Sequence, residues 1–201
     1  MATNPHSIPH PKVDPTRRPA MRPDNTPDDN DRIEIGPTPL AYAEWAQAGL
    51  QCPDQPAMRQ YRLDRIVAGL IERDLDAVLL FDPLSIRYAT DTTHMQLWNS
   101  HNPFRACMVT SDGHMVLWEY GGYAYMSEYN PLVREVRAGA SFFYFATGQR
   151  TEEKAEKFVG QVTEVLQQRV GNGRRVAVDK IQIAGLRALD EAGVQVMDGE
   201  E

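Results

Sequence analysis

The stretch MQLWNSHNPFR, residues 95–105, gathers aromatic and polar side chains where a strand would alternate apolar and polar residues. It joins one large aromatic face to amide, imidazole and guanidinium groups. Ligand pockets are typically lined by apolar and aromatic side chains together with a few polar groups that orient the ligand, and this stretch combines both kinds. We therefore interpret five residues as substrate-pocket candidates: Trp98, Asn99, His101, Asn102 and Arg105. A structural interpretation stays open beside it, in which Trp98 anchors the core and Arg105 pairs with an acid.

The motifs of a self-contained active site are missing from the 201 residues. The sequence has no GxSxG, no HExxH, no GxGxxG after a strand and no GxxxxGK[ST]. Cys52 and Cys107 do not have the spacing of a metal motif, and His94 and His101 bracket the stretch without an acid at ligand spacing. Asp179 follows an expected strand, where capping of the next helix is favoured over catalysis. We assign no catalytic residue and no metal ligand to this chain.

The composition excludes several classes of partner. The formal net charge is −7, and no basic stripe offsets it, which argues against nucleic-acid binding. The longest strongly apolar run, AVLLF at residues 77–81, is far too short to span a membrane. The first residues contain no apolar core of a secretory signal, and the two cysteines fit a reducing compartment. We expect a cytoplasmic protein that binds neither nucleic acid nor membrane.

Two regions differ in composition. Nine of the fourteen prolines lie between Pro5 and Pro39, among residues with little apolar surface to bury. This pattern predicts a disordered Pro-rich arm over residues 1–30 and one folded domain over residues 31–201.

Periodic patterns predict the elements that position the candidate stretch. One apolar face recurs at helical spacing from residue 56 to residue 74, and a second does so over residues 151–170. The run DAVLLFDP indicates a buried central strand, and Asp82 with Pro83 is a typical helix start. Residues 41–50 indicate a short helix in which Trp45 forms a packing face.

The second half of the chain alternates strands with helices. RACMVT and HMVLWEY flank the turn SDG and predict a β-hairpin, with WNSHNPFR as a loop before it. Further on we expect a short helix over residues 123–129, a strand at LVREVRAG with an aromatic edge at FFYF, strands at RRVAVD and VQVMD, and a helix over residues 183–192. The alternation predicts a three-layer α/β domain with a mixed sheet.

The order of these elements resembles the N-terminal domain of the creatinase, prolidase and aminopeptidase P family of pita-bread metalloenzymes. The runs DDNDRIEIGPT, FDPLSIRYATDTTHMQLWNSHNPFRA, NPLVRE and AVDKI are more narrowly similar to the dimethylsulfoniopropionate lyase branch. The resemblance covers residues 24–201. FDPLSIRYATD alone is typical of the whole family, whereas LWNSHNPFR together with IEIGPT is more specific.

The resemblance implies that this chain is a non-catalytic domain, which supports a homodimer and covers an active site. The metal ligands of that active site are expected in a C-terminal catalytic pita-bread domain, which is absent from this chain. No cofactor is expected in this chain itself; a dinuclear metal centre, with iron as the expected metal, belongs to the missing domain. The alternatives are the same domain of a creatinase-like or Xaa-Pro peptidase-like enzyme, and a stand-alone interaction module.

For the lyase branch the implied reaction is β-elimination on a small zwitterionic substrate, with release of dimethyl sulfide and acrylate. The resemblance implies that Trp98 belongs to the substrate pocket. A sulfonium cation has no N–H or O–H to donate, so an indole face is a suitable partner for it.

Overall fold

The structure is a computed structural model that describes residues 39–200. The Pro-rich arm predicted over residues 1–30, and the run IEIGPT, lie outside these residues. The described helices are α1 (Pro39–Gln47), α2 (Gln55–Glu72), α3 (Pro83–Thr90), α4 (Gln96–His101), η1 (Ala124–Ser127), α5 (Tyr144–Thr147), η2 (Gly148–Arg150), α6 (Thr151–Val170) and α7 (Ile183–Glu191). The described strands are β1 (Ala77–Leu80), β2 (Ala106–Thr110), β3 (Met115–Trp118), β4 (Val133–Arg137), β5 (Arg175–Val178) and β6 (Gln195–Asp198).

The strands form one mixed sheet in the order β4-β3-β2-β1-β5-β6. β1 pairs antiparallel with β2 and parallel with β5, so Leu79 lies between Met108 and Val178. β2 and β3 form the predicted antiparallel hairpin, and β4 and β6 extend the sheet by parallel pairing. The mixed sheet predicted from the alternating pattern is confirmed.

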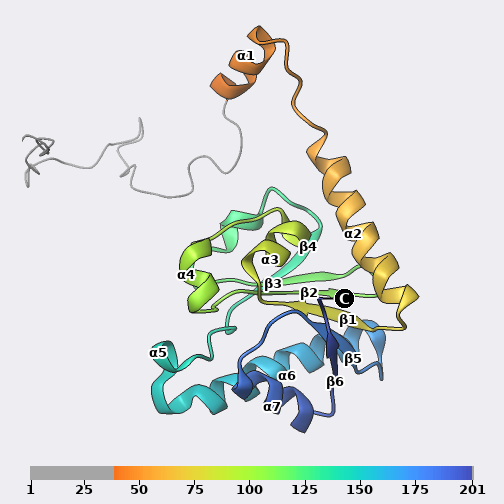
Figure 1. Ribbon diagram of the computed structural model, residues 1–201, viewed down its shortest axis with the longest axis vertical. Helices are drawn as coiled ribbons and strands as arrows, with labels where there is room; N and C mark the ends of the chain where they lie inside the picture. Colours follow the sequence, from red (N-terminus) through yellow and green to blue (C-terminus); the bar gives the residue numbers. More distant parts are fainter. Residues whose placement is uncertain (1–38, 201) are drawn as a thin grey trace, which may run out of the picture. The chain divides into compact units, whose positions relative to one another are not determined.

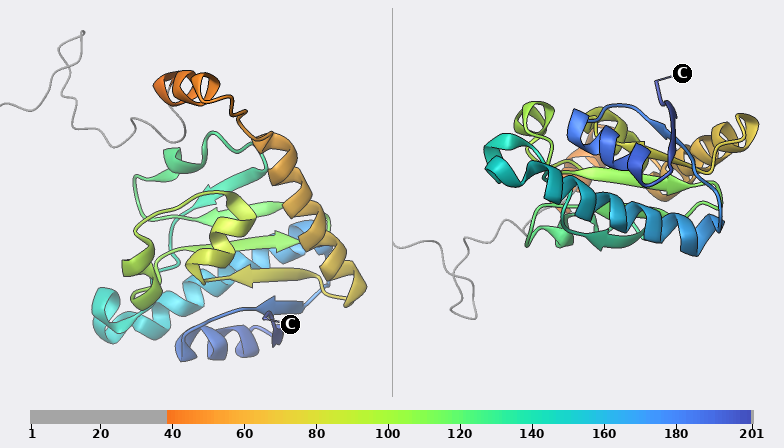
Figure 2. Two further views of the ribbon diagram at one scale, coloured as in Figure 1. Left: turned by 45° about the horizontal axis from the view of Figure 1, so that its top comes forward. Right: turned by 90° about the horizontal axis from the view of Figure 1, so that it is seen from below.

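Helices cover both faces of this sheet (Figures 1 and 2). α6 and α7 pack on one face, where Ala77 and Leu79 point, while α2 and α3 pack on the other face, where Val78 and Leu80 point. Successive side chains of a strand point to opposite faces, so a fully apolar strand must be covered on both. The three-layer α/β architecture is therefore confirmed.

Local signals in the sequence placed most of the helices. α6 has the predicted bounds, and α2 begins after Asp54, whose carboxylate accepts a hydrogen bond from the amide of Ala57. Asp82 accepts hydrogen bonds from the amides of Leu84 and Ser85, so the predicted helix start is confirmed.

Three local predictions were wrong. Residues 96–101 form the helix α4 and not a loop, and part of the aromatic run FFYF forms the helix α5 and not a sheet edge. Asp179 does not cap the next helix, α7, which has no side-chain cap. Its carboxylate instead accepts hydrogen bonds from the amides of Phe81 (2.7 Å) and Asp82 (3.1 Å), which joins the end of β5 to the end of β1.

Candidate functional site

α4 brings the candidate stretch to the surface as a short helix. It starts after Met95, whose φ of 43° lies in the left-handed region and which provides no side-chain cap. The helix is held at its other end by Asn99, whose Oδ1 accepts a 3.0 Å hydrogen bond from the amide of Phe104. Asn99 is 1% exposed, and its Nδ2 atom has no hydrogen-bond partner among the described residues.

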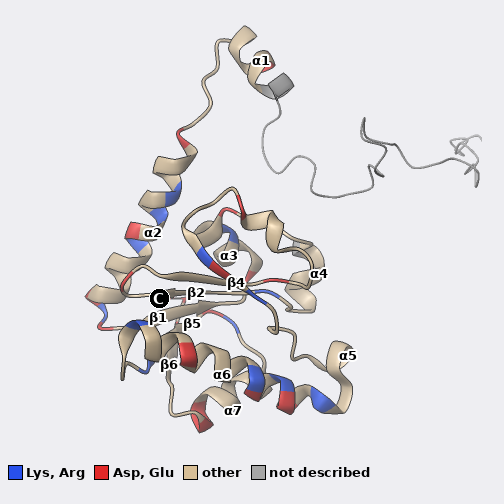
Figure 3. Ribbon diagram, turned by 180° about the vertical axis from the view of Figure 1, so that it is seen from behind, with Lys and Arg blue, Asp and Glu red and all other residues tan. Residues whose placement is uncertain are grey.

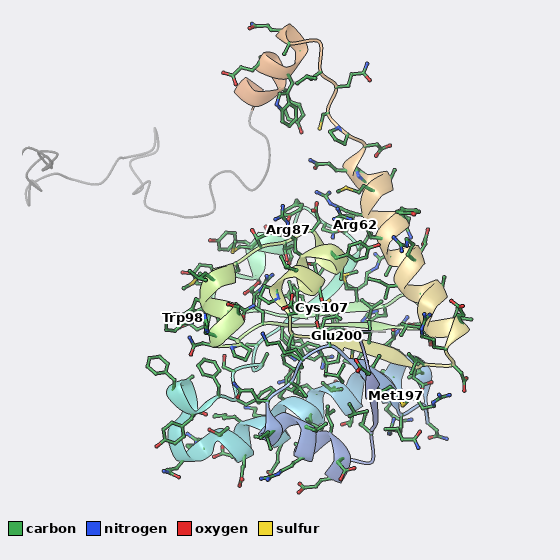
Figure 4. All side chains as sticks on the ribbon, viewed as in Figure 1. Arg62, Arg87, Trp98, Cys107, Met197 and Glu200 are labelled. Atoms are coloured by element: carbon green, nitrogen blue, oxygen red, sulfur yellow. The ribbon has the colours of Figure 1, made fainter. Side chains whose placement is uncertain are left out.

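Trp98 lies on the outer side of α4, as Figure 4 shows, and is 43% exposed. Trp98 contacts Phe145 of α5 in a T-shaped arrangement, in which the edge of one ring meets the face of the other and the centroids are 5.9 Å apart. The structural interpretation of Trp98 as a buried core anchor is therefore wrong, because much of the indole remains open to solvent.

Trp98 lines a cavity of about 310 Å³ between α4, α5 and the end of the β2–β3 hairpin, which we call the aromatic hollow. Its lining contains no charged side chain and consists of Met95, Trp98, Phe104, Tyr120, Ser141, Phe143, Phe145 and Ala146. Two of the lining residues, Phe104 and Tyr120, meet in a T-shaped contact with ring centroids 5.5 Å apart, and we call this pair the Phe104–Tyr120 wall. A hollow walled by π faces suits a small ligand that combines apolar groups with a positive charge.

A buried ion-pair network contacts the Phe104–Tyr120 wall. The carboxylate of Glu119 accepts a 2.8 Å hydrogen bond from the Nε of Arg105 and a 2.9 Å hydrogen bond from the amide of Tyr120. Its other close partner is the Nδ1 of His94, also at 2.8 Å. Arg105 in turn donates to the hydroxyl of Thr92 at 2.7 Å.

This network fixes the residues on which the hollow depends. Glu119 precedes Tyr120, and Arg105 follows Phe104, so a single carboxylate joins two wall segments. The ring of His94 packs against Phe104 at a centroid distance of 5.3 Å. A buried carboxylate that is paired and hydrogen-bonded in this way holds a fixed geometry.

The structure separates the five predicted pocket residues. Trp98 lines the aromatic hollow, whereas Arg105 is 1% exposed and pairs with Glu119, as the structural interpretation of that residue predicted. Asn99 is buried, His101 is exposed, and Asn102 is half-buried at the end of α4. None of these four lines the hollow.

Glu119 and the other aromatic walls were not predicted from the sequence. The hairpin register pairs Ala106 with Trp118, and continuing it by one residue places Arg105 opposite Glu119. The hairpin pattern of the sequence therefore contained the signal for the Arg105–Glu119 pair. Phe143 and Phe145 come from a distant segment, and no sequence spacing links them to Trp98.

Within residues 39–200, the two thiols and the carboxylates form no second candidate site. Cys107 is fully buried in β2, where burial raises the pKa of its thiol to about 12. Burial also raises the pKa of Asp179. Among the residues that the structure describes, no three His, Cys, Asp or Glu side chains are grouped to hold a metal ion. The described residues therefore do not fit the dinuclear centre that the resemblance implies. No described helix is both long and apolar enough to cross a bilayer.

Comparisons with known proteins find relatives in sequence and similar chains among solved structures. The dimethylsulfoniopropionate lyase DddP of Roseovarius nubinhibens is 52% identical over 190 residues, and that of Roseobacter denitrificans is 50% identical over 190 residues. Each alignment covers 94% of this chain but 42% of the relative, so the chain spans less than half the length of these relatives. An Xaa-Pro aminopeptidase structure from Streptococcus pyogenes aligns with a TM-score of 0.49 at 12% identity, over 71% of this chain and 92% of that one.

A family model, that of the creatinase/prolidase N-terminal domain, matches residues 62–201. The match spans the whole sheet, the aromatic hollow, and the helices on both faces of the sheet except the first part of α2. The chain therefore belongs to the creatinase/prolidase N-terminal domain family.

Proposed function

We propose that this chain is the N-terminal part of a dimethylsulfoniopropionate lyase and that its aromatic hollow forms one wall of the substrate site. Two relatives that are about half identical over nearly the whole chain carry that name. The observation that carries the proposal is the partly exposed indole of Trp98 in the lining of an uncharged aromatic hollow.

The chemistry of the substrate fits such a wall. Dimethylsulfoniopropionate carries a sulfonium cation at one end and a carboxylate at the other. The cation has methyl groups and no hydrogen-bond donor, so π faces and apolar contacts are its suitable partners. Attraction of a cation to an aromatic face contributes about 0.5–2 kcal/mol, more where water is excluded.

The reaction in this proposal is β-elimination. A base removes the proton next to the substrate carboxylate, the electron pair forms the carbon–carbon double bond, and dimethyl sulfide leaves with the electrons of the carbon–sulfur bond. Acrylate remains. The aromatic hollow would hold the leaving sulfur, and its apolar lining would bind the neutral dimethyl sulfide more weakly than the cation, which favours its release.

The base and any metal are assigned to no residue of this chain. Within the described part, Glu119, which precedes the lining residue Tyr120, is already engaged, because Arg105 and His94 bind its carboxylate. We therefore propose that the catalytic groups lie in the part of the longer relatives that this chain does not match. In this view the present domain orients the substrate and excludes water, which raises the rate by positioning.

A chimera tests this function. In the relative from Roseovarius nubinhibens, the 190 residues that match would be replaced by the corresponding residues of this chain. We expect the purified chimera to release dimethyl sulfide from dimethylsulfoniopropionate and to leave Xaa-Pro dipeptides intact. The matched control carries instead the aligned region of the Streptococcus pyogenes peptidase. A folded chimera that releases no dimethyl sulfide, or a control that releases as much, contradicts the proposal.

A further inference from the structure

The aromatic rings of the hollow are set at steep angles to one another. Five lining side chains are aromatic, namely Trp98, Phe104, Tyr120, Phe143 and Phe145. The planes of Trp98 and Phe145 meet at 71°, and those of Phe104 and Tyr120 also meet at 71°. Rings at such angles present π faces in different directions. The hollow therefore resembles the aromatic cages that bind cationic head groups, and it is more than a single stacking surface.

The hollow offers a ligand few hydrogen-bond acceptors. α4 and α5 contain no Lys, Arg, Asp or Glu, as the uncoloured ribbons in Figure 3 show. The carboxylate of Glu119 is engaged by Arg105 and His94. Among the described side chains that line the hollow, only Tyr120 and Ser141 carry an oxygen atom, in each case a hydroxyl. A ligand with several N–H donors would therefore leave some of them unpaired.

Part of the lining is shielded from water. Phe104 and Phe143 are buried, whereas Trp98, Tyr120 and Phe145 are exposed. A head group that contacts the buried rings has to give up much of its water. The identity of the head group then decides how much this transfer costs.

The number of N–H groups on a cation sets that cost. A primary ammonium group has three donors and is strongly hydrated, so its burial without acceptors is unfavourable. A fully alkylated cation has no donor to satisfy, and its methyl groups make apolar contacts while its charge is attracted to the π faces. The lining of the hollow therefore favours alkylated cations over ammonium groups of the same charge.

We propose that the aromatic hollow binds fully alkylated onium head groups as a class, quaternary ammonium as well as sulfonium, and rejects ammonium groups that carry N–H. The inference rests on the proposed function for the position of the substrate's cationic end, and it adds the class of ligand. The described lining contains no cationic side chain, so the carboxylate of a zwitterion stays outside the hollow. A trimethylammonium zwitterion would therefore compete with the sulfonium substrate for the same position.

Three carboxylates that differ in the head group test the proposal. The first, 3-(trimethylammonio)propanoate, has a quaternary ammonium group, and 3-aminopropanoate has a primary ammonium group. The third, 4,4-dimethylpentanoate, is the neutral isostere of the first. The chain has three tryptophans, so a heteronuclear NMR spectrum of the isotope-labelled 201-residue chain contains three indole N–H signals. The Trp98→Phe variant identifies the signal of Trp98, and titration of the unaltered chain then measures binding without any turnover.

We expect 3-(trimethylammonio)propanoate to shift the Trp98 signal saturably. The neutral isostere should bind about twofold to thirtyfold more weakly, as the loss of a cation–π contact predicts. The primary ammonium compound should bind at least about tenfold more weakly. The signal of Trp118, a buried residue whose indole N–H donates to Gln161, should not move. Equal affinities for the three compounds, an unmoved Trp98 signal, or equal shifts of Trp98 and Trp118 would each overturn the proposal.

A variant with an added acceptor tests the cause of the selectivity. Ser141→Asp places a carboxylate in the lining, and it should raise the affinity for 3-aminopropanoate about tenfold relative to 3-(trimethylammonio)propanoate. The matched control is Gln149→Asp, which adds the same charge at an exposed residue outside the lining and should leave this ratio unchanged. An unchanged ratio in a folded Ser141→Asp chain, or an equal change in both variants, overturns the proposal.

The lyase function and the ligand class can fail separately. A selective titration together with a folded chimera that releases no dimethyl sulfide would overturn the lyase function alone. An active chimera together with an unselective hollow would overturn the ligand class alone.

Discussion

Arg105 donates a 2.8 Å hydrogen bond from its Nε to the carboxylate of Glu119, with the side chains 1% and 2% exposed. The residue that looked like a ligand contact in the sequence is thus a buried support behind the aromatic hollow. Its partner precedes Tyr120, whose amide the same carboxylate binds. The pair therefore joins the two segments that carry the Phe104–Tyr120 wall.

Removing one side chain of this ion pair tests how much the pair contributes to the stability of the fold. We expect Arg105→Ala to lower the free energy of unfolding by about 3–5 kcal/mol, because it leaves a buried carboxylate without its guanidinium partner. Urea denaturation followed by circular dichroism measures the loss. Arg150→Ala, which breaks an ion pair of exposed side chains with Glu153, serves as the control and should leave the midpoint nearly unchanged. Equal midpoints for the two variants would show that the buried pair adds no stability.

Asp179 provides a second test of the fold. We expect Asp179→Ala to lower the free energy of unfolding by about 1–3 kcal/mol, because the amides of Phe81 and Asp82 lose their acceptor. Asp190→Ala, at an exposed position of α7, is the matched control and should change the free energy of unfolding little. The same urea denaturation experiment compares the two variants. A loss no larger than that of the control would mean that water replaces the carboxylate without cost.

Asp112 gives a prediction on pH dependence. Burial acts to raise the pKa of this carboxyl, but hydrogen bonds from Thr110, His114 and Arg169 hold the pKa below its ordinary value. Because the folded state has the lower pKa, the ionised carboxylate stabilises the fold at neutral pH. That contribution is lost as the pH falls through the folded-state pKa.

The comparison of Asp112→Asn with the unaltered chain measures this effect. The variant should be less stable at pH 7 by no more than about 1 kcal/mol, since the ion pair with Arg169 is partly exposed. The difference should shrink as the pH falls below about 4, the ordinary range of an aspartate. A stability difference that stays constant from pH 7 to pH 3 would refute the assigned cause.

The sequence predicted those parts of the fold that depend on local pattern. Leu63 and Leu70 belong to a helical repeat, and Ala77 to Leu80 form an apolar run that only a buried strand accommodates, so α2 and β1 were predictable. α4 was not, because it has six residues and begins at Met95 without a capping side chain. Local propensity gives almost no signal for a helix of that kind.

The candidate site was predictable only where a local sequence pattern marks it. Trp98 was found because it lies in an unusual cluster, and the structure places it at the aromatic hollow. Its companions were missed because the hollow joins α4, α5 and the hairpin end, and sequence distance hides such contacts. Polarity alone suggested a binding role for Arg105, although a buried arginine paired across a hairpin has the same sequence appearance.

The most direct test of the proposed function is turnover by Trp98 variants in the lyase chimera, measured beside their melting temperatures. We expect Trp98→Ala to lower kcat/KM for dimethylsulfoniopropionate at least about tenfold, since both the π contact and the orientation of the substrate are lost. Trp98→Phe should keep part of the activity because a smaller π face remains. The melting temperature should change little, because the indole is 43% exposed.

Tyr144→Ala, which removes an exposed aromatic side chain of α5 outside the hollow, is the control and should keep full turnover. Normal turnover by a stably folded Trp98→Ala chimera would contradict the account.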